Sequence, residues 1–198
     1  MRHGNGYTLV DGMVAVALLA LAALVAIPNL ERARRNAGLE GICRTLAATA
    51  HLCRLRALNA GRNAGLVFVK AGGRWSFTPA IDGDGDGVSR RDVERGIDQP
   101  MGPTVRLEAL CQGATIGVPA GWRVPNPTGR GWLRAGDGLA AGRSDIISFS
   151  ATGDATPATV YVNDGRSRLL AVRVYGGTAR VRVLEWRAGW TAWRRLAI

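Results

Sequence analysis

The sequence has 198 residues, of which 47% are hydrophobic, and this length suits one folded domain with a modest core. Its formal net charge at pH 7 is +11, and Lys70 is its only lysine, so arginine supplies nearly all of the positive charge. The two histidines, His3 and His51, lie far apart in the sequence, and the acidic residues show no paired catalytic spacing. These features argue against an enzyme.

The main feature of the N-terminal region is an uncharged apolar segment, Gly12 to Leu30. As a helix rising about 1.5 Å per residue, it is long enough to cross a hydrocarbon core of roughly 30 Å. Arg2 and His3 precede it and several arginines follow it, which suits a membrane anchor or a secretory signal. The residues after Ile27 match a signal-peptidase site poorly, so we expect the helix to be retained.

The residues just before this segment, Gly6-Tyr7-Thr8-Leu9-Val10-Asp11, resemble the processing site of type IV prepilins and type II secretion pseudopilins. The resemblance implies that a prepilin peptidase cuts between Gly6 and Tyr7 and methylates the new N-terminus. Asp11 would then be the fifth mature residue, where the family has a glutamate that pairs with the N-terminal amine of a neighbouring subunit. Aspartate keeps that charge with a shorter reach. Pro28 matches the family's helix-disrupting proline and predicts a kink just before it.

Beyond the apolar segment, residues recurring at three- and four-residue steps predict an amphipathic continuation of the helix that ends at Gly61. These residues are Ile42, Leu46, Thr49, Cys53 and Ala57. Cys53 to Gly61 is similar to the helix end of the FimT/GspH branch of minor pilins and pseudopilins. Ile147 to Thr156, followed by Thr159 to Val162, is similar to that branch's signature of a phenylalanine strand, a glycine turn and a valine-rich strand.

This resemblance implies an α+β protein with the pilin-like fold, in which a long N-terminal membrane and filament-core helix packs on a small antiparallel β-rich head. It divides the chain into a prepilin leader (residues 1–6), a hydrophobic helix (7–30), an amphipathic continuation of that helix (31–61) and the β-rich head (62–198).

Short runs rich in Val, Ile, Thr and aromatic residues predict the strands of the head. The expected strands are Leu66 to Lys70, Trp75 to Ala80, Thr104 to Leu107, Thr115 to Val118, Ile146 to Ser150, Thr159 to Val162, Leu169 to Tyr175 and Thr178 to Leu184. The first two form a hairpin around Ala71 to Arg74, whereas Asp82 to Gly102 is expected to be a loop. Trp122 and Trp132 are expected to cover the core from loops, the alternative being a ligand platform.

Three cysteines would meet an oxidising compartment if the head is exported. Cys43 and Cys53 are separated by about 15 Å along one predicted helix, which is too far for a bond between them. A disulfide would therefore join Cys111 to Cys53 or Cys43. The alternative is that all three are small buried hydrophobic residues.

The run from Asp82 to Gly87 places carboxylates at alternating positions with a glycine sixth, as in a calcium loop of the EF-hand type. The twelfth position is Val93, so the usual bidentate closing ligand is missing, and Asp92 or Asp98 would have to close a shorter loop. The resemblance is relevant because some pseudopilins hold calcium in their heads. Two hypotheses follow: a Ca²⁺ site, or a solvated acidic turn. The candidate ligands are Asp82, Asp84, Asp86 and Asp92.

Alternation within Val172 to Leu184 places valines on one face, expected to be core, and arginines on the other, expected to face solvent. Arginines near tryptophans can contact phosphates and stack on bases. FimT-like minor pilins of transformable bacteria bind DNA through a basic motif near the C-terminal strands, and Gly177 to Arg182 is similar in kind. The alternative is a solvated face of an arginine-rich protein. The candidate DNA-binding residues are Arg173, Arg180, Arg182 and Arg187.

The sequence therefore predicts a minor pilin or pseudopilin subunit, processed by prepilin peptidase and assembled into a type IV pilus or a type II secretion pseudopilus. Before assembly it would cross the inner membrane once, with a periplasmic head. Its expected partners are other pilins or pseudopilins, the peptidase and the membrane. The alternative function is a DNA-binding minor pilin that acts in DNA uptake. No cofactor is required, and Ca²⁺ is the one candidate.

Overall fold

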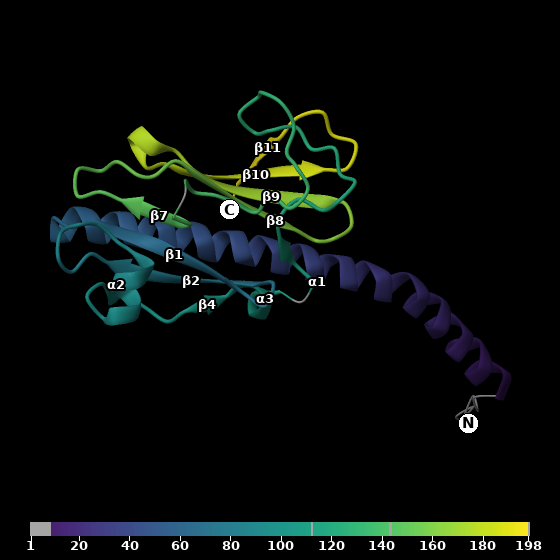
Figure 1. The fold of residues 1–198 in the computed structure, drawn as a ribbon. Coiled ribbons are helices and arrows are strands. Elements are labelled where there is room, and N and C mark those ends of the chain that lie inside the picture. Colours follow the sequence, from purple (N-terminus) through teal and green to yellow (C-terminus); the bar gives the residue numbers. More distant parts are fainter. Residues whose placement is uncertain (1–8, 112, 143, 198) are drawn as a thin grey trace. The chain divides into compact units, whose positions relative to one another are not determined.

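The computed structural model describes residues 9–111, 113–142 and 144–197. The chain divides into two compact units, Met1–Ala37 and Gly38–Ile198, and each is described by itself. The first unit holds the N-terminal part of helix α1 (Leu9–Ala60), and the second holds the rest of α1 with all of the strands. The α+β class predicted from the sequence is confirmed (Figure 1).

Helix α1 is continuous through Pro28, so the expected disruption there does not end the element. Its C-terminal part buries one stripe of side chains at three- and four-residue steps, as the sequence pattern predicted, except that Ala50 is buried in place of Thr49, which is half-buried. The buried stripe consists of Leu39, Ile42, Cys43, Leu46, Ala50, Cys53 and Ala57. Gly61 follows the helix with a φ of 64°, a left-handed conformation that glycine adopts without strain, so the predicted stop is confirmed.

The first sheet is built on the predicted hairpin of β1 (Ala64–Ala71) and β2 (Arg74–Ile81). Its strand order is β3-β2-β1-β7, with β4 also paired to β2, and the short strands are β3 (Gln99–Pro100), β4 (Val105–Arg106) and β7 (Ile146–Phe149). The segment expected to be a loop between Asp82 and Gly102 also contains helix α2 (Arg90–Arg95), which Ser89 caps. A short helix α3 (Leu107–Leu110) follows β4, so the predicted third strand is shorter than expected.

The second sheet is antiparallel, with the order β11-β10-β9-β8-β5 and β6 paired to β8. Its strands are β5 (Thr115–Ile116), β6 (Leu139–Ala140), β8 (Ala158–Asn163), β9 (Arg168–Val174), β10 (Val181–Arg187) and β11 (Arg194–Leu196), and the 3-10 turn η1 (Gly176–Thr178) joins β9 to β10. Strands β3, β6 and β11 were not predicted from the sequence. The residues that β10 and β9 pair include Arg182 with Arg173 and Val183 with Val172.

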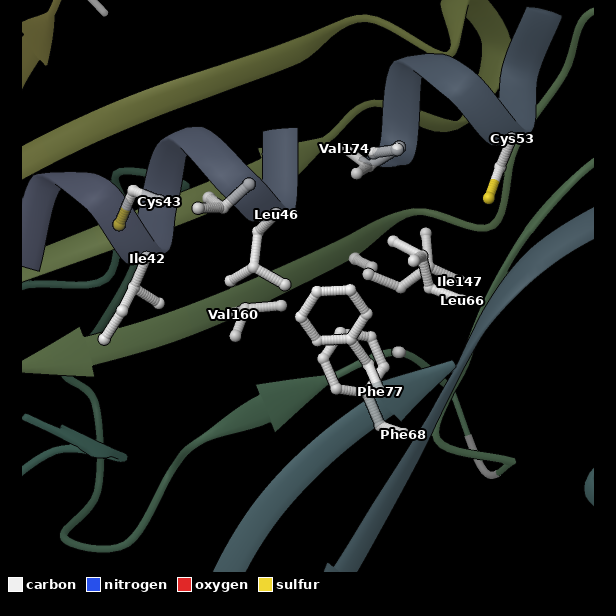
Figure 2. Packing of buried hydrophobic residues seen from close by; sticks show 14 of the residues in the cluster. Ile42, Cys43, Leu46, Cys53, Leu66, Phe68, Phe77, Ile147, Val160 and Val174 are labelled. Carbon is white, nitrogen blue, oxygen red and sulfur yellow. The ribbon is translucent and has the colours of Figure 1, made fainter. Parts of the chain in front are cut away.

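The main core lies between the two sheets, where the C-terminal part of α1 also packs (Figures 1 and 2). Leu46 of the helix, Phe68 and Phe77 of the first sheet, and Val160 and Val174 of the second sheet all belong to this core. The two phenylalanine rings lie 5.7 Å apart, between centroids, in a tilted arrangement. Burial on this scale couples the helix to both sheets, because each buried large apolar side chain contributes about 1.5–3 kcal/mol.

Smaller clusters cover the outer face of each sheet. On the first sheet, Val88 from the segment before α2 packs with Val67, Ala80 and Ile146. On the second sheet, the cluster consists of Val118, Val124, Tyr161, Leu169, Ala171 and Trp186. The expectation that the arginine-bearing face of β9 and β10 simply faces solvent is therefore wrong, because the loop that contains Val118 and Val124 packs over part of it.

Candidate functional site

The N-terminal part of α1 exposes its apolar side chains throughout the described residues. The large ones are Leu9, Val10, Met13, Val14, Val16, Leu18, Leu19, Leu21, Leu24, Ile27 and Leu30. Within the part of the chain that the structure describes, α1 is the one helix long and apolar enough to cross a membrane, judged by length and composition. Asp11 lies in its first turn, while the predicted processing residues Gly6 and Tyr7 lie outside the described residues.

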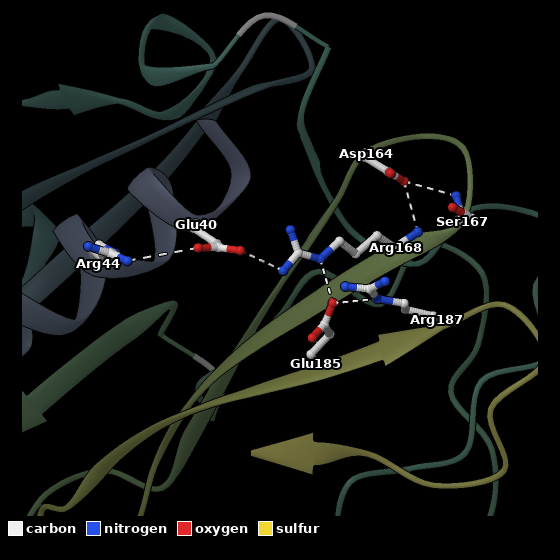
Figure 3. A network of polar contacts seen from close by, with 7 residues as sticks. All are labelled: Glu40, Arg44, Asp164, Ser167, Arg168, Glu185 and Arg187. Atoms are coloured by element: carbon white, nitrogen blue, oxygen red, sulfur yellow. Dashed lines mark hydrogen bonds and ion pairs between the residues drawn. The ribbon is translucent and has the colours of Figure 1, made fainter. Parts of the chain in front are cut away.

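A chain of charged side chains ties α1 to the second sheet within the head (Figure 3). The guanidinium of Arg168, which is 5% exposed, donates from Nη2 to Glu40 Oε1 at 2.7 Å and from Nε to Glu185 Oε1 at 2.6 Å. Arg187 donates from Nε to the same oxygen of Glu185 at 2.7 Å. Arg44, whose Nη2 is 3.8 Å from Glu40 Oε2, thus lies at one end of the cluster and Arg187 at the other (Figure 3).

The ionisation of this cluster follows from its contacts. Burial by itself raises the pKa of Glu185, but the hydrogen bonds and charges of Arg187 and Arg168 outweigh it and leave that pKa below its usual value. Burial likewise opposes the charge of Arg168, but the hydrogen bonds that its guanidinium donates to Glu40 and Glu185 outweigh this effect, so the pKa of Arg168 is raised. Sequence reasoning missed these residues. The available signal was Glu185, a charge at a position on β10 that alternation assigns to the core side.

The acidic loop, which is the segment from Asp82 to Gly87, brings three of the four predicted calcium ligands together. The carboxylates of Asp82, Asp84 and Asp86 offer oxygens that all lie within 4.8 Å of one another. Asp82 is buried and accepts hydrogen bonds from the backbone N–H groups of Gly85 at 2.7 Å and Gly87 at 3.0 Å. The fourth residue, Asp92, belongs instead to the N-terminus of α2, where it bonds with Ser89.

Asp98, the alternative closing ligand, is buried and accepts from the N–H groups of Gly83 at 3.1 Å and Ser89 at 2.8 Å, so it shapes the loop. A hydrogen bond to Asp84 and the charge of that carboxylate raise the pKa of Asp86. Three carboxylates crowded in this way suit a hard cation with oxygen ligands. The donor set therefore fits Ca²⁺ in three ligands and lacks the fourth that the sequence suggested.

The four candidate DNA-binding arginines fall into three environments. Arg173 and Arg182 are cross-strand neighbours, and their guanidinium carbons lie 4.9 and 5.6 Å from the centroid of the Tyr175 ring. Arg180 is exposed in the turn before β10. Arg187 points to the opposite side of β10 from Arg182, toward Glu185, because the two residues are an odd number of positions apart. The structure therefore does not bring Arg187 together with the others.

Two adjacent cavities lie between the C-terminal part of α1 and strands β10 and β11. Their volumes are about 440 and 560 Å³, and His51 and Val181 line both. Arg44, Arg182 and Arg195 line the first, and Arg54 and Arg180 line the second. This surface is basic, because these five arginines line it and no acidic residue is among the described residues of its lining.

An aromatic groove of about 520 Å³ lies over the outer face of the second sheet. Its walls include Trp122, Trp132, Trp186, Trp190 and Arg123, and the rest of its lining comes from Gly121, Ala188, Gly189 and Thr191. Trp122 packs on Trp186 with ring centroids 5.8 Å apart, as the predicted covering role requires. Trp132 is 56% exposed, so the same prediction is wrong for that residue, whose ring lies under the Arg123 guanidinium at 4.5 Å.

The thiols of Cys43 and Cys53 are free and buried in the main core. Neither forms the bridge to Cys111 that the sequence left open, and both side chains instead pack as small apolar groups. Burial raises the pKa of each of these two thiols to about 12. Cys111 packs against Gly38 of α1.

No protein-family model matches the sequence, and comparison with the curated proteins finds no match. Among solved structures, the chain is similar to the minor pseudopilin EpsH from the type 2 secretion system of Vibrio cholerae. The two share 15% sequence identity with a TM-score of 0.41, over 73% of this chain and 94% of EpsH. At that TM-score the likeness decides nothing about the function of this chain.

Proposed function

We propose that the chain is a minor pilin or pseudopilin subunit whose work is assembly into a filament. The observation that carries the proposal is the N-terminal part of α1, which is apolar on all sides and holds an acidic residue, Asp11, in its first turn. A helix that is hydrophobic all round needs an apolar environment, either lipid or the packed helices of other subunits. Two sequence features also support the proposal: the processing motif at Gly6 and Tyr7, and the resemblance to FimT/GspH proteins, which carry such a helix.

In this proposal, prepilin peptidase cuts after Gly6, and α1 rests in the inner membrane with the head in the periplasm. On assembly, the helix exchanges lipid for neighbouring helices. Asp11 would then pair with the N-terminal amine of a neighbouring subunit, as the glutamate at this position does in the family that the sequence resembles. Within the head, the Glu40–Arg168 ion pair would hold the C-terminal part of α1 against the second sheet.

The test co-expresses the full chain with a prepilin peptidase in a host that makes such filaments. Intact mass should show loss of residues 1–6 and gain of one methyl group. Asp11→Ala should leave cleavage and membrane insertion unchanged but reduce recovery of the chain in sheared filaments at least tenfold, whereas Asp11→Glu should retain it. Recovery of Asp11→Ala equal to that of the unchanged chain would overturn the assembly role.

DNA binding is the second candidate, and the basic cavities beside α1 favour it. Arg44 and Arg182 line one of these cavities and Arg54 and Arg180 the other, and arginines gathered in this way would be available to phosphates. The chain's affinity for a labelled duplex should fall steeply as the salt concentration rises from 50 to 200 mM. At any one salt concentration, the variant Arg180→Ala/Arg182→Ala should bind the duplex more weakly than the unchanged chain. Arg74→Ala, an exposed arginine on the β1–β2 hairpin, is the matched control. Absence of binding at low salt excludes this candidate.

A further inference from the structure

The inference concerns the aromatic groove, and it rests on the proposed assembly function. We propose that the groove receives the acidic loop of a second copy of this chain, with Asp84 and Asp86 of the partner copy meeting Arg123 and Arg194. The contact is heterologous, since the groove and the loop are different surfaces of one head. Such a contact repeats from one subunit to the next instead of closing into a dimer.

The composition of the groove is that of a protein-binding surface. Tryptophan and arginine are the residue types that dominate binding energy at protein interfaces. Here Trp132 is 56% exposed, although large aromatic side chains are usually covered, and the Arg123 guanidinium lies 4.5 Å from the centroid of its ring. Trp190 lies on the other wall, and next to it the Arg194 guanidinium is 4.2 Å from the centroid of the Trp190 ring. Both arginines are exposed, so their charges are available to a partner.

The charge of the groove is one-sided. The two segments that build it, residues 118–134 and 186–195, contain six arginines and no acidic residue. These arginines are Arg123, Arg130, Arg134, Arg187, Arg194 and Arg195. The Arg187 guanidinium is already paired with Glu185, so Arg123 and Arg194 are the cations beside the indole rings that remain for a partner. A partner for this surface has to be acidic.

The acidic loop is the complementary surface on the same chain. Between residues 82 and 98 the sequence has six acidic residues and three arginines, a local balance of −3 in a chain whose net charge is +11. Asp84 and Asp86 are exposed at the tip of this segment. The oxygens of these carboxylates lie within 4.8 Å of one another, so a cation brought close to the pair would relieve their mutual repulsion. Gly83, Gly85 and Gly87 alternate with these aspartates, so no bulky side chain stands beside the two carboxylates, which suits entry into a groove of about 520 Å³.

The two surfaces lie on opposite sides of the head. The acidic loop runs into Val88, which packs on the outer face of the first sheet, while the groove includes Trp186, which packs on the outer face of the second sheet. The main core separates the two sheets (Figure 1). The loop therefore cannot reach the groove of its own chain, and one head can use both surfaces at once with different neighbours.

The experiment uses the full chain in detergent micelles and follows its mass by sedimentation velocity. The unchanged chain should form species larger than a dimer that dissociate at 500 mM salt. The groove variant Arg123→Glu/Arg194→Glu and the loop variant Asp84→Arg/Asp86→Arg should each associate at least tenfold more weakly. An equimolar mixture should form one-to-one dimers that do not extend, because the groove variant retains a normal loop and the loop variant a normal groove. The matched control, Arg74→Glu, should associate normally.

Four results overturn the proposal. The first three are a chain that stays monomeric, association that both charge-reversed variants retain, and a mixture of the two variants that fails to form dimers. The fourth is binding of a dT oligonucleotide that Trp132→Ala abolishes while self-association persists, since the groove would then hold a polyanionic strand. Failure here is distinguishable from failure of the assembly proposal. Loss of self-association leaves the Asp11→Ala result unaffected, and charge-reversed dimers would form even if α1 never entered a filament.

Discussion

Glu40 of helix α1 and Arg168 of strand β9 lie 128 positions apart in the sequence, yet Arg168 Nη2 donates a hydrogen bond to Glu40 Oε1 at 2.7 Å. The same guanidinium holds the buried carboxylate of Glu185 (Figure 3). Removing one member of such a cluster leaves uncompensated charge in the protein interior, which costs far more than the pair itself contributes.

Arg168→Ala should therefore lower the free energy of unfolding by about 3–5 kcal/mol, because Glu185 stays buried without its main partner. Arg187→Ala, which removes a partner that is half exposed, should cost about 1 kcal/mol or less. Urea unfolding of the full chain in mild detergent measures both. Equal losses in the two variants would show that the buried position of Arg168 has no special weight.

The cluster also predicts how stability depends on pH. Because the pKa of Glu185 is lower in the folded chain than in the unfolded chain, the folded state binds fewer protons, and its contribution is present above the unfolded value of about 4.3. That contribution is lost as the pH falls through the lower folded value. Asp164 acts in the same direction: burial opposes its charge, but the backbone N–H groups of Arg168, Arg166 and Ser167 lower its pKa. The melting temperature should fall from pH 5 to pH 3, and less so in Asp164→Asn.

Gly38 and Gly41 are a matched pair on α1. A Cβ at Gly38 would collide with the Sγ and Cβ atoms of Cys111, whereas a Cβ at Gly41 meets nothing within 4 Å. Gly41→Ala should stabilise the chain by about 0.5–1 kcal/mol through helix propensity. Gly38→Ala should instead destabilise it by about 1–3 kcal/mol through overpacking, and Cys111→Ala in the same chain should recover part of that loss. Equal effects of the two glycine substitutions would contradict this packing.

Cys43 and Cys53 should resist alkylation in the folded chain, since burial raises the pKa of each thiol to about 12 and excludes the reagent. In urea without reductant, both should react with iodoacetamide, and mass spectrometry of the digested chain locates the adducts. If one of these cysteines reacts in urea only after reductant is added, that result would show that it forms a disulfide with Cys111.

The acidic loop gives a prediction about calcium. If Asp82, Asp84 and Asp86 hold Ca²⁺, millimolar Ca²⁺ should raise the melting temperature of the chain, and Asp84→Ala should abolish the rise. Glu94→Gln, an exposed carboxylate of α2 outside the cluster, is the control and should leave the rise intact. Asp86→Asn should abolish the rise yet leave the metal-free chain no less stable, because it removes a carboxylate whose pKa is raised by repulsion from Asp84. A melting temperature unaffected by Ca²⁺ would favour the solvated acidic turn.

Much of the fold follows from local sequence. Spacing at three and four residues predicted the buried stripe from Ile42 to Ala57 apart from Thr49, and glycine predicted the helix end at Gly61. Short runs rich in β-branched and aromatic residues predicted the β1–β2 hairpin and strands β8 and β9, whereas β10 begins at Val181 and not at the expected Thr178. These features depend on the helical and strand periods and on backbone conformations that one residue type favours, so a short stretch of sequence contains all the information.

The partners of the charged and aromatic side chains are decided by the tertiary structure alone. Nothing near Arg168 in the sequence indicates that its partner is Glu40, and nothing near Trp132 indicates that Trp190 lines the opposite wall of a groove. Arg187 is separated from the other candidate arginines because it lies on the other side of β10, where it donates to Glu185. Each of these contacts joins segments that only the stacking of two sheets and one helix brings together. Local sequence thus determined which elements form, and long-range packing determined which side chains meet.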